Sequence, residues 1–294
     1  MATEEIKDSL KVHSYSGCIS AAFMAIRDKA IPTTRKYWKI MLIISFLQTA
    51  LFTFSSTLTN GMIYVGFPLE TSQIAICTAL TFILYYCIEG CIFSLVNGQK
   101  AVWSIVRLFK TIPVQIVLYL IYILFIVGGT YALMTITGKA TNQTTLFQVV
   151  GIALIMIIPM LVLIVPTMYV FTKYLVEPDS RLYADFFHDY KLGFKHWGLI
   201  FLTMLLSALC ICIVEATLLM PVHMLELIKN VEAYSMVSQG DEPALPHYFI
   251  ALYALFTFIK SFMELYIFAF AVYATYFVYG TIKLKSQPKK KTED

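Results

Sequence analysis

The sequence predicts an all-α membrane protein that crosses the bilayer six times, and two observations support this prediction. Apolar residues make up 59% of the chain and charged residues 14%, whereas soluble domains carry about 25% charged residues. Each apolar run reaches the roughly 20 residues that cross a ~30 Å hydrocarbon core. Buried helices of a large soluble protein are the alternative, which the scarcity of charge disfavours. The six runs cover residues 40–58, 72–96, 112–136, 146–172, 198–222 and 248–282.

The distribution of Lys and Arg predicts the orientation of these runs. All but three of the 22 basic residues lie before the first run, between the second and third, between the fourth and fifth, or after the sixth; the exceptions are Lys139, Lys229 and Lys260. Basic loops stay in the cytoplasm, so both termini are expected there. The net charge of +4 therefore reflects one membrane face and does not point to nucleic acid.

The approach to each odd-numbered run predicts a threefold internal repeat of parallel hairpins. A lysine stands two residues before a large apolar residue at Lys36, Lys110 and Lys195. A basic residue followed by an aromatic also marks a cytoplasmic interface without any repetition, and that alternative stays open. The predicted repeat units are residues 16–97, 98–176 and 177–285, with a short basic cytoplasmic tail at 283–294. Together they form one six-span domain.

Each hairpin is expected to follow an amphipathic helix that lies in the membrane interface. Apolar residues recur at three- or four-residue spacing in the first and third of these segments, which is typical of such helices. The middle segment, 100–110, is less regular, and a solvated linker is its alternative. Parallel repeats relate by an axis along the membrane normal, with the even-numbered spans near that axis. The residues are Ile19, Phe23, Ile26 and Ala30 in the first segment, and Leu182, Phe186, Tyr190 and Phe194 in the third.

The stretch from Glu177 to Trp197 carries a family resemblance. An acidic residue follows a span, Ala184 lies in a short helix, and Lys191-Leu192-Gly193 precede Trp197. This pattern resembles the membrane domain of bacterial glycerophosphodiester phosphodiesterases and related six-span bacterial membrane proteins. The resemblance implies repeated hairpins with interfacial helices in a bacterial cytoplasmic (inner) membrane. It does not imply hydrolase activity, because a separate soluble domain carries that chemistry in those enzymes.

Ionisable residues inside the apolar runs are candidates for a functional site. They are expensive to place in lipid, at about 2.5–3.5 kcal/mol near the centre of a span. Lys260 and Glu264 are four residues apart and can pair on one helix face, and Glu89 lies at a comparable depth. These three are a candidate polar cluster, and holding a proton or a cation is one hypothesis for its role, although a purely structural role is favoured over it. A structural ion pair between the second and sixth spans is the alternative, and Glu215 is a further buried carboxyl.

Two other sets of residues are weaker candidates. Pro159 and Pro166 lie seven residues apart in the fourth span and are a candidate hinge, since proline removes a backbone donor and favours a kink. Prolines are also ordinary in membrane helices, and that alternative is favoured. Asp185, His188 and Asp189 predict a polar interfacial surface before the fifth span. We expect neither a metal nor a cofactor, because no second histidine or cysteine completes a metal-binding set.

Three classes of function fit these observations. The favoured one is a non-enzymatic accessory or scaffold protein that binds membrane lipid or a membrane-protein partner. The second is a small transporter or exporter with Glu89, Lys260 and Glu264 as its coupling site. The third is an interfacial lipid-modifying enzyme that uses Asp185, His188 and Asp189.

Overall fold

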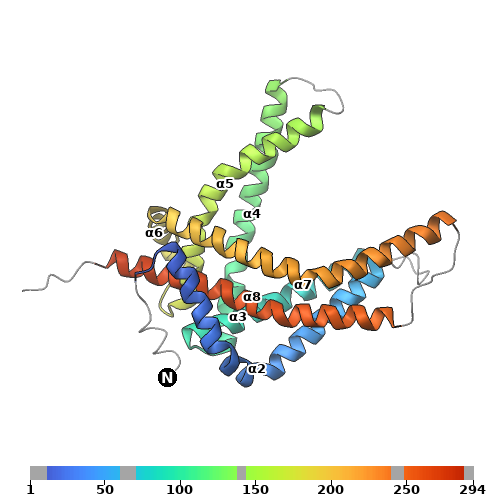
Figure 1. The fold of residues 1–294 in the computed structure, drawn as a ribbon. Helices are drawn as coiled ribbons and strands as arrows, with labels where there is room; N and C mark the ends of the chain where they lie inside the picture. Colours follow the sequence, from blue (N-terminus) through green and yellow to red (C-terminus); the bar gives the residue numbers. More distant parts are fainter. Residues whose placement is uncertain (1–11, 60–70, 138–143, 240–247, 288–294) are drawn as a thin grey trace, which may run out of the picture. The chain divides into compact units, whose positions relative to one another are not determined.

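The computed structural model describes residues 12–59, 71–137, 144–239 and 248–287, and these residues form α-helices without a strand (Figure 1). The predicted all-α class is therefore confirmed for the described part of the chain. The outer-loop residue Lys139 and the tail beyond residue 287 lie outside it. The helices are α2 (Tyr15–Thr59), α3 (Thr71–Asn97), α4 (Ala101–Thr137), α5 (Thr144–Val176), α6 (Leu182–Lys195), α7 (Trp197–Gln239) and α8 (Phe249–Ser286).

Four described segments are long and apolar enough to cross a membrane, and two shorter apolar segments accompany them. Helix α4 exposes apolar side chains, because none of its most apolar part is buried. Lipid is the solvent that suits such a surface. The four are Ala101–Gly129, Pro159–Val176, Trp197–Ile228 and Phe249–Ser286, and the shorter two are Met41–Ala50 and Phe82–Asn97.

The predicted interfacial helices differ from one another in the structure. Helices α2 and α4 each run without a break from the amphipathic segment into the apolar run. Helix α4 begins at Ala101, three residues after Gly98 ends the preceding helix with a φ of 72°. A separate helix is found before the third hairpin. This helix, α6, ends at Lys195, and the backbone amide of the following residue, His196, donates to the carbonyls of Gly193 and Phe194.

Helix α7 extends beyond the fifth predicted apolar run, which ends at residue 222. The helix continues to Gln239 through Pro221. The residues after 222 have good helical propensity, and a helix need not end where its apolar run ends.

The chain divides into two compact units that cut across the helices. Unit 1 consists of Met1–Cys18, Phe93–Met204 and Thr275–Asp294, and unit 2 of Ile19–Ile92 and Leu205–Ala274. Helices α2, α3, α7 and α8 each contribute to both units. The predicted division into three repeat units follows other boundaries and stays a prediction.

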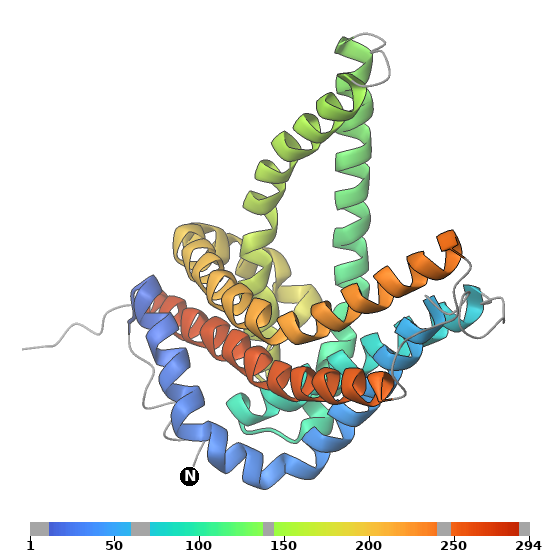
Figure 2. The same ribbon diagram turned by 45° about the vertical axis from the view of Figure 1, so that its right-hand side comes forward.

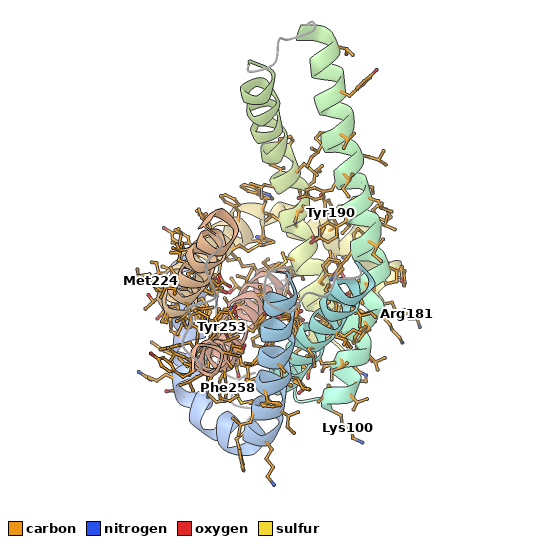
Figure 3. The ribbon with its side chains drawn as sticks, turned by 90° about the vertical axis from the view of Figure 1, so that its right-hand side faces the viewer. Lys100, Arg181, Tyr190, Met224, Tyr253 and Phe258 are labelled. Carbon is orange, nitrogen blue, oxygen red and sulfur yellow. The ribbon has the colours of Figure 1, made fainter. Side chains whose placement is uncertain are left out.

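In unit 1, α5 packs against both α4 and α6 (Figures 1 and 2). Arg107 of α4 stabilises the turn after α5. Its guanidinium lies between the rings of Trp103 and Tyr174, at 4.5 and 4.0 Å from their centroids. It donates hydrogen bonds of 2.8 Å to the carbonyls of Pro178 and Ser180. The exposed side chains of Lys100 and Arg181 project from the same unit (Figure 3).

In unit 2, a small apolar core joins α7 to α8. Val222 and Leu225 of α7 are buried with Phe249 and Tyr253 of α8, and Figure 3 labels Tyr253. The Tyr253 hydroxyl donates a 3.0 Å hydrogen bond to Glu226. The phenol therefore keeps a polar partner while its ring is buried.

Candidate functional site

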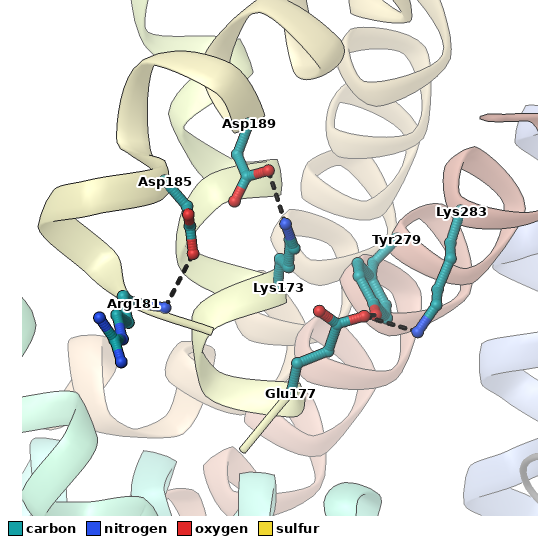
Figure 4. Close-up of polar contacts among 7 residues, drawn as sticks. All are labelled: Lys173, Glu177, Arg181, Asp185, Asp189, Tyr279 and Lys283. Carbon is teal, nitrogen blue, oxygen red and sulfur yellow. Dashed lines mark hydrogen bonds and ion pairs between the residues drawn. The ribbon is translucent and has the colours of Figure 1, made fainter. Parts of the chain in front are cut away.

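The last turns of α3, α5 and α8 meet around a group of polar side chains in unit 1. Glu177 follows the final residue of α5, and its Oε1 accepts hydrogen bonds from the Tyr279 hydroxyl and, at 2.5 Å, from the Lys283 ammonium (Figure 4). At the end of α3, the Asn97 amide donates to the Leu175 carbonyl at 3.0 Å. The end of α5 is thus tied to both other helices.

A cleft of about 620 Å³ lies among these helix ends. It is within the 300–1,000 Å³ range of ligand sites. Its walls combine carboxylates, an ammonium group, side-chain amides and apolar residues. The lining residues are Val96, Asn97 and Gln99, then Val176, Glu177, Pro178 and Asp179, and finally Tyr276, Tyr279, Gly280, Lys283, Leu284 and Gln287.

The surroundings of Glu177 favour its ionised form. Burial alone would raise the pKa of this carboxyl, but hydrogen bonds from Lys283 and Tyr279 and the charges of Lys283 and Lys173 outweigh burial, so the pKa is lowered. Both hydrogen bonds reach the same oxygen, Oε1. Within the described residues no group donates a hydrogen bond to Oε2 of Glu177. This acceptor is consequently available at the cleft wall.

Helix α6 is fastened to α5 by an ion pair, a hydrogen bond and a close backbone approach. The Lys173 ammonium lies 2.6 Å from the carboxylate of Asp189, whose side chain is 2% exposed (Figure 4). The Tyr190 hydroxyl donates a 2.9 Å hydrogen bond to the carbonyl of Leu163. A methyl group at Gly193 would lie 2.8 Å from the Pro166 carbonyl oxygen. The side of α6 that meets α5 is therefore complementary to α5 in both shape and charge.

The outer face of α6 carries exposed aromatic rings. Phe187 is 77% exposed and Tyr183 69% exposed, and Phe194 is half exposed. The predicted apolar row of Leu182, Phe186, Tyr190 and Phe194 is only partly on this face, because Leu182 is buried. Periodicity identified an amphipathic helix, but it did not distinguish the face that meets α5 from the face that meets the surroundings.

The predicted interfacial residues have different roles on this helix. Asp185 accepts a 3.0 Å hydrogen bond from the backbone amide of Arg181, in the first turn of α6, where a negative charge also favours the helix dipole. Asp189 is buried against Lys173, while His188 is exposed. The two carboxylates therefore stabilise local structure. Among the described residues, no group of His, Cys, Asp and Glu is arranged to hold a metal.

In unit 2, the predicted pairing of Lys260 with Glu264 is present. Their charged groups are 2.9 Å apart on α8, and both side chains are largely buried. The third group at this carboxylate is the Tyr85 hydroxyl of α3, which donates to Glu264 Oε2 at 3.3 Å. Glu89, one turn further along α3, is half-buried. In the part of the chain that the structure describes, Glu89 has no ion pair with Lys260.

A row of buried polar residues on α2 was not identified from the sequence. Ser45, Gln48 and Thr49 are all buried, and the side chain of Gln48 lies within hydrogen-bonding reach of Tyr85. Among the described side chains, Gln48 Oε1 and Ser45 Oγ are buried without a hydrogen-bond partner. Their three- and four-residue spacing within an apolar run is the signal that would have indicated a shared inward face.

The two prolines predicted as a hinge lie within a continuous α5. Pro159 is exposed, whereas Pro166 is buried and its carbonyl contacts the position of Gly193. Proline at 166 also loosens the hydrogen bonding of the preceding turn, and the Tyr190 hydroxyl supplies a donor to the Leu163 carbonyl there. Pro166 therefore contributes to the docking of α6. A hinge at Pro159 and Pro166 stays a prediction.

No protein-family profile, curated protein or solved structure matches this chain. The resemblance to the membrane domain of glycerophosphodiester phosphodiesterases accordingly stays a prediction.

Proposed function

We propose that this protein is a non-enzymatic, multi-pass membrane protein that acts as an accessory or scaffold component. Helix α6 is the surface through which it binds lipid or a membrane-protein partner. The observation that carries this proposal is the pairing of a firmly docked inner face with an exposed aromatic outer face on one short helix.

The inner face of α6 fixes the helix in place, and the outer face offers groups that can bind lipid or a partner. Because Asp189, Tyr190 and Gly193 hold the helix against α5, binding through the outer face requires little additional ordering, and such preorganisation favours affinity. Exposed rings at Tyr183 and Phe187 suit the boundary between headgroups and acyl chains. Lys191 and Lys195 are also exposed on α6 and would attract anionic lipid.

The proposed arrangement in the membrane is six spans as three parallel hairpins, with both termini in the cytoplasm of a bacterial cell. The even-numbered spans correspond to α3, α5 and α8. The convergence of their last turns in unit 1, through Asn97, Glu177 and Lys283, supports a central position for these three helices.

Replacing the exposed rings of α6 tests the proposed function. The variant is Tyr183→Ser with Phe187→Ser, and the control is Tyr248→Ser, which removes another exposed aromatic immediately before α8. Each protein is purified from native membranes in mild detergent, and co-purifying proteins and lipids are identified by mass spectrometry. We expect the wild type and the control to retain the same partner or lipids and the double variant to lose them. An identical set for all three proteins would rule out α6 as the binding surface.

A transporter is the second candidate, and the network in unit 2 favours it. Lys260, Glu264 and Tyr85 interact inside apolar helices, beside a buried glutamine oxygen without a partner. Buried polar groups in a membrane are expensive, and in transporters they mark ion or proton pathways. The test is proton entry into proteoliposomes after a membrane potential is imposed. Glu264→Gln should abolish an entry that Asp28→Asn leaves intact, and equal entry in both variants would exclude this coupling site.

A further inference from the structure

We propose that the cleft among the ends of α3, α5 and α8 binds the headgroup of a zwitterionic phospholipid that carries a primary ammonium group, as in phosphatidylethanolamine. This inference rests on the proposed membrane function. It concerns a site built from other residues than the exposed rings of α6, and it names the chemical class of the ligand.

The position of the cleft matches that of a lipid headgroup. The candidate span Pro159–Val176 ends beside it, and Glu177 is the next residue. Val96, Val176 and Leu284 supply apolar wall next to charged and amide side chains. A phospholipid has the same arrangement of groups, because its acyl methylenes adjoin a charged headgroup at the depth where a span ends.

The acidic wall of the cleft offers acceptors to an ammonium group. Oε2 of Glu177 accepts no hydrogen bond from the described residues, although Oε1 accepts two. The carboxylate of Asp179, two residues later, is exposed and also lines the cleft. A primary ammonium has three N–H donors, so it can donate to both carboxylates. A quaternary ammonium of the phosphatidylcholine type has no such donor.

The basic wall offers donors to a phosphate. The Lys283 ammonium uses one donor on Glu177 Oε1, and its side chain is 45% exposed. Its remaining N–H groups are available for a phosphate oxygen, and charge-assisted hydrogen bonds of this kind are the strong ones. Because Glu177 and Lys283 adjoin, a ligand with both charges close together satisfies both walls. A purely anionic headgroup could use Lys283 but would itself carry no cation for the two carboxylates.

Contacts behind the wall hold these groups in place before any ligand binds. The Asn97 amide is occupied by Leu175 and by the Ser104 hydroxyl, so it fixes the helix ends. Tyr279 donates to Glu177 and lies with its ring 5.7 Å from the Lys283 ammonium. A cleft with fixed charges selects a ligand whose charge pattern matches its own, whereas a flexible surface can bind many lipids.

The experiment compares three lipids that share acyl chains. Delipidated full-length protein in detergent is titrated with phosphatidylethanolamine, phosphatidylcholine or phosphatidylglycerol, and bound lipid is counted by native mass spectrometry. We expect phosphatidylethanolamine to bind about tenfold more tightly than either other lipid, which is the difference for one charge-assisted hydrogen bond. Equal binding of the three lipids would overturn the inference.

Two cleft variants and two controls locate the site. Glu177→Gln combined with Asp179→Asn should remove the preference for phosphatidylethanolamine, and Lys283→Met should weaken binding of all three lipids, because each carries a phosphate. The glutamine keeps acceptors for Tyr279 and Lys283, and Asp179 is exposed, so the double variant is compatible with folding. Lys285→Met removes a charge from the same helix outside the cleft, and Asp28→Asn removes an exposed carboxylate in α2; neither should change binding.

The outcomes separate this inference from the proposed function. A preference that survives both cleft variants but disappears with the Tyr183 and Phe187 substitutions would place lipid binding on α6 and overturn the cleft site. Loss of the preference in the variant that combines Glu177→Gln with Asp179→Asn, but not in the α6 variant, would support it. If the wild type holds partners or lipids without preference among headgroups, the headgroup inference fails while the accessory function stands.

Discussion

Gly193 is a position at which α6 approaches the backbone of α5 closely. A methyl group there would meet the Pro166 carbonyl oxygen at 2.8 Å and the Tyr169 side chain at 3.2 Å. A backbone carbonyl cannot move aside as a flexible side chain can, so overpacking is expected to cost about 1–3 kcal/mol. Gly193→Ala should therefore lower the thermal unfolding temperature.

Gly198, five residues later, is the matched control for Gly193→Ala. A methyl group at Gly198 would meet nothing within 4 Å, and alanine has the better helical propensity by about 1 kcal/mol. Gly198→Ala should leave the unfolding temperature unchanged or raise it. Equal effects of the two substitutions would show that the close approach at Gly193 is not important for stability.

The pH dependence of stability should reflect His196, at the break between α6 and α7. Burial and the charges of Lys285 and Lys195 lower the pKa of this imidazole from 6.5. The unfolded chain therefore binds a proton at a higher pH than the folded protein, and stability falls as the pH drops below 6.5. The pKa of Glu177 is lowered from 4.5, so protonation of this carboxyl should also reduce stability, as the pH falls below 4.5.

A substitution isolates the contribution of His196. Unfolding temperatures are measured at pH 7.5 and 5.5 for the wild type and for His196→Gln. We expect the wild type to lose more stability between these two values than the variant does. A loss of the same size in both proteins would assign the pH dependence to other groups.

At the scale of elements, the Lys173–Asp189 pair joins α5 to α6. Its groups are 2.6 Å apart, and Asp189 is almost completely buried. Lys173→Met leaves a buried carboxylate without a counter-charge, which is expected to cost about 3–5 kcal/mol. Adding Asp189→Leu removes that charge and should restore part of the stability.

A double-mutant cycle measures this coupling by thermal unfolding, with Lys173→Met, Asp189→Leu and the combination. The coupling is expected because the two groups share one buried contact. Strictly additive effects would mean that the pair does not fasten α6 to α5, and the proposed preorganisation of the outer face would lose its main support.

Helix bounds show which parts of an element the sequence predicts well. The apolar runs located the candidate membrane spans of α4, α5, α7 and α8, because the ability to cross a bilayer depends on composition over about 20 residues. The ends were less predictable. Helix propensity carries α2 and α4 through their amphipathic segments, and apolar periodicity does not report where hydrogen bonding stops.

For the whole molecule, the orientation in the membrane is the testable property. A reporter fused after Lys139, in the predicted outer loop, should be extracytoplasmic, while one fused after Lys100 should be cytoplasmic, because basic loops are retained on that side. Activity of alkaline phosphatase and fluorescence of green fluorescent protein distinguish the two sides. A cytoplasmic reporter at Lys139 would exclude the six-span arrangement.

The sequence by itself determined the class of the protein, its apolar helices and the pairing of Lys260 with Glu264, because composition and spacing along one helix decide these properties. Only the tertiary structure decided which side chains meet between helices. Glu177 lies about one hundred residues before its two partners, Tyr279 and Lys283, which are one turn apart on α8. At the other cluster, the side chain that reaches Glu264 is Tyr85 and not Glu89. Such contacts depend on the rotation and depth of each helix against its neighbours. Packing sets both, and the periodicity of a single helix carries no information about either.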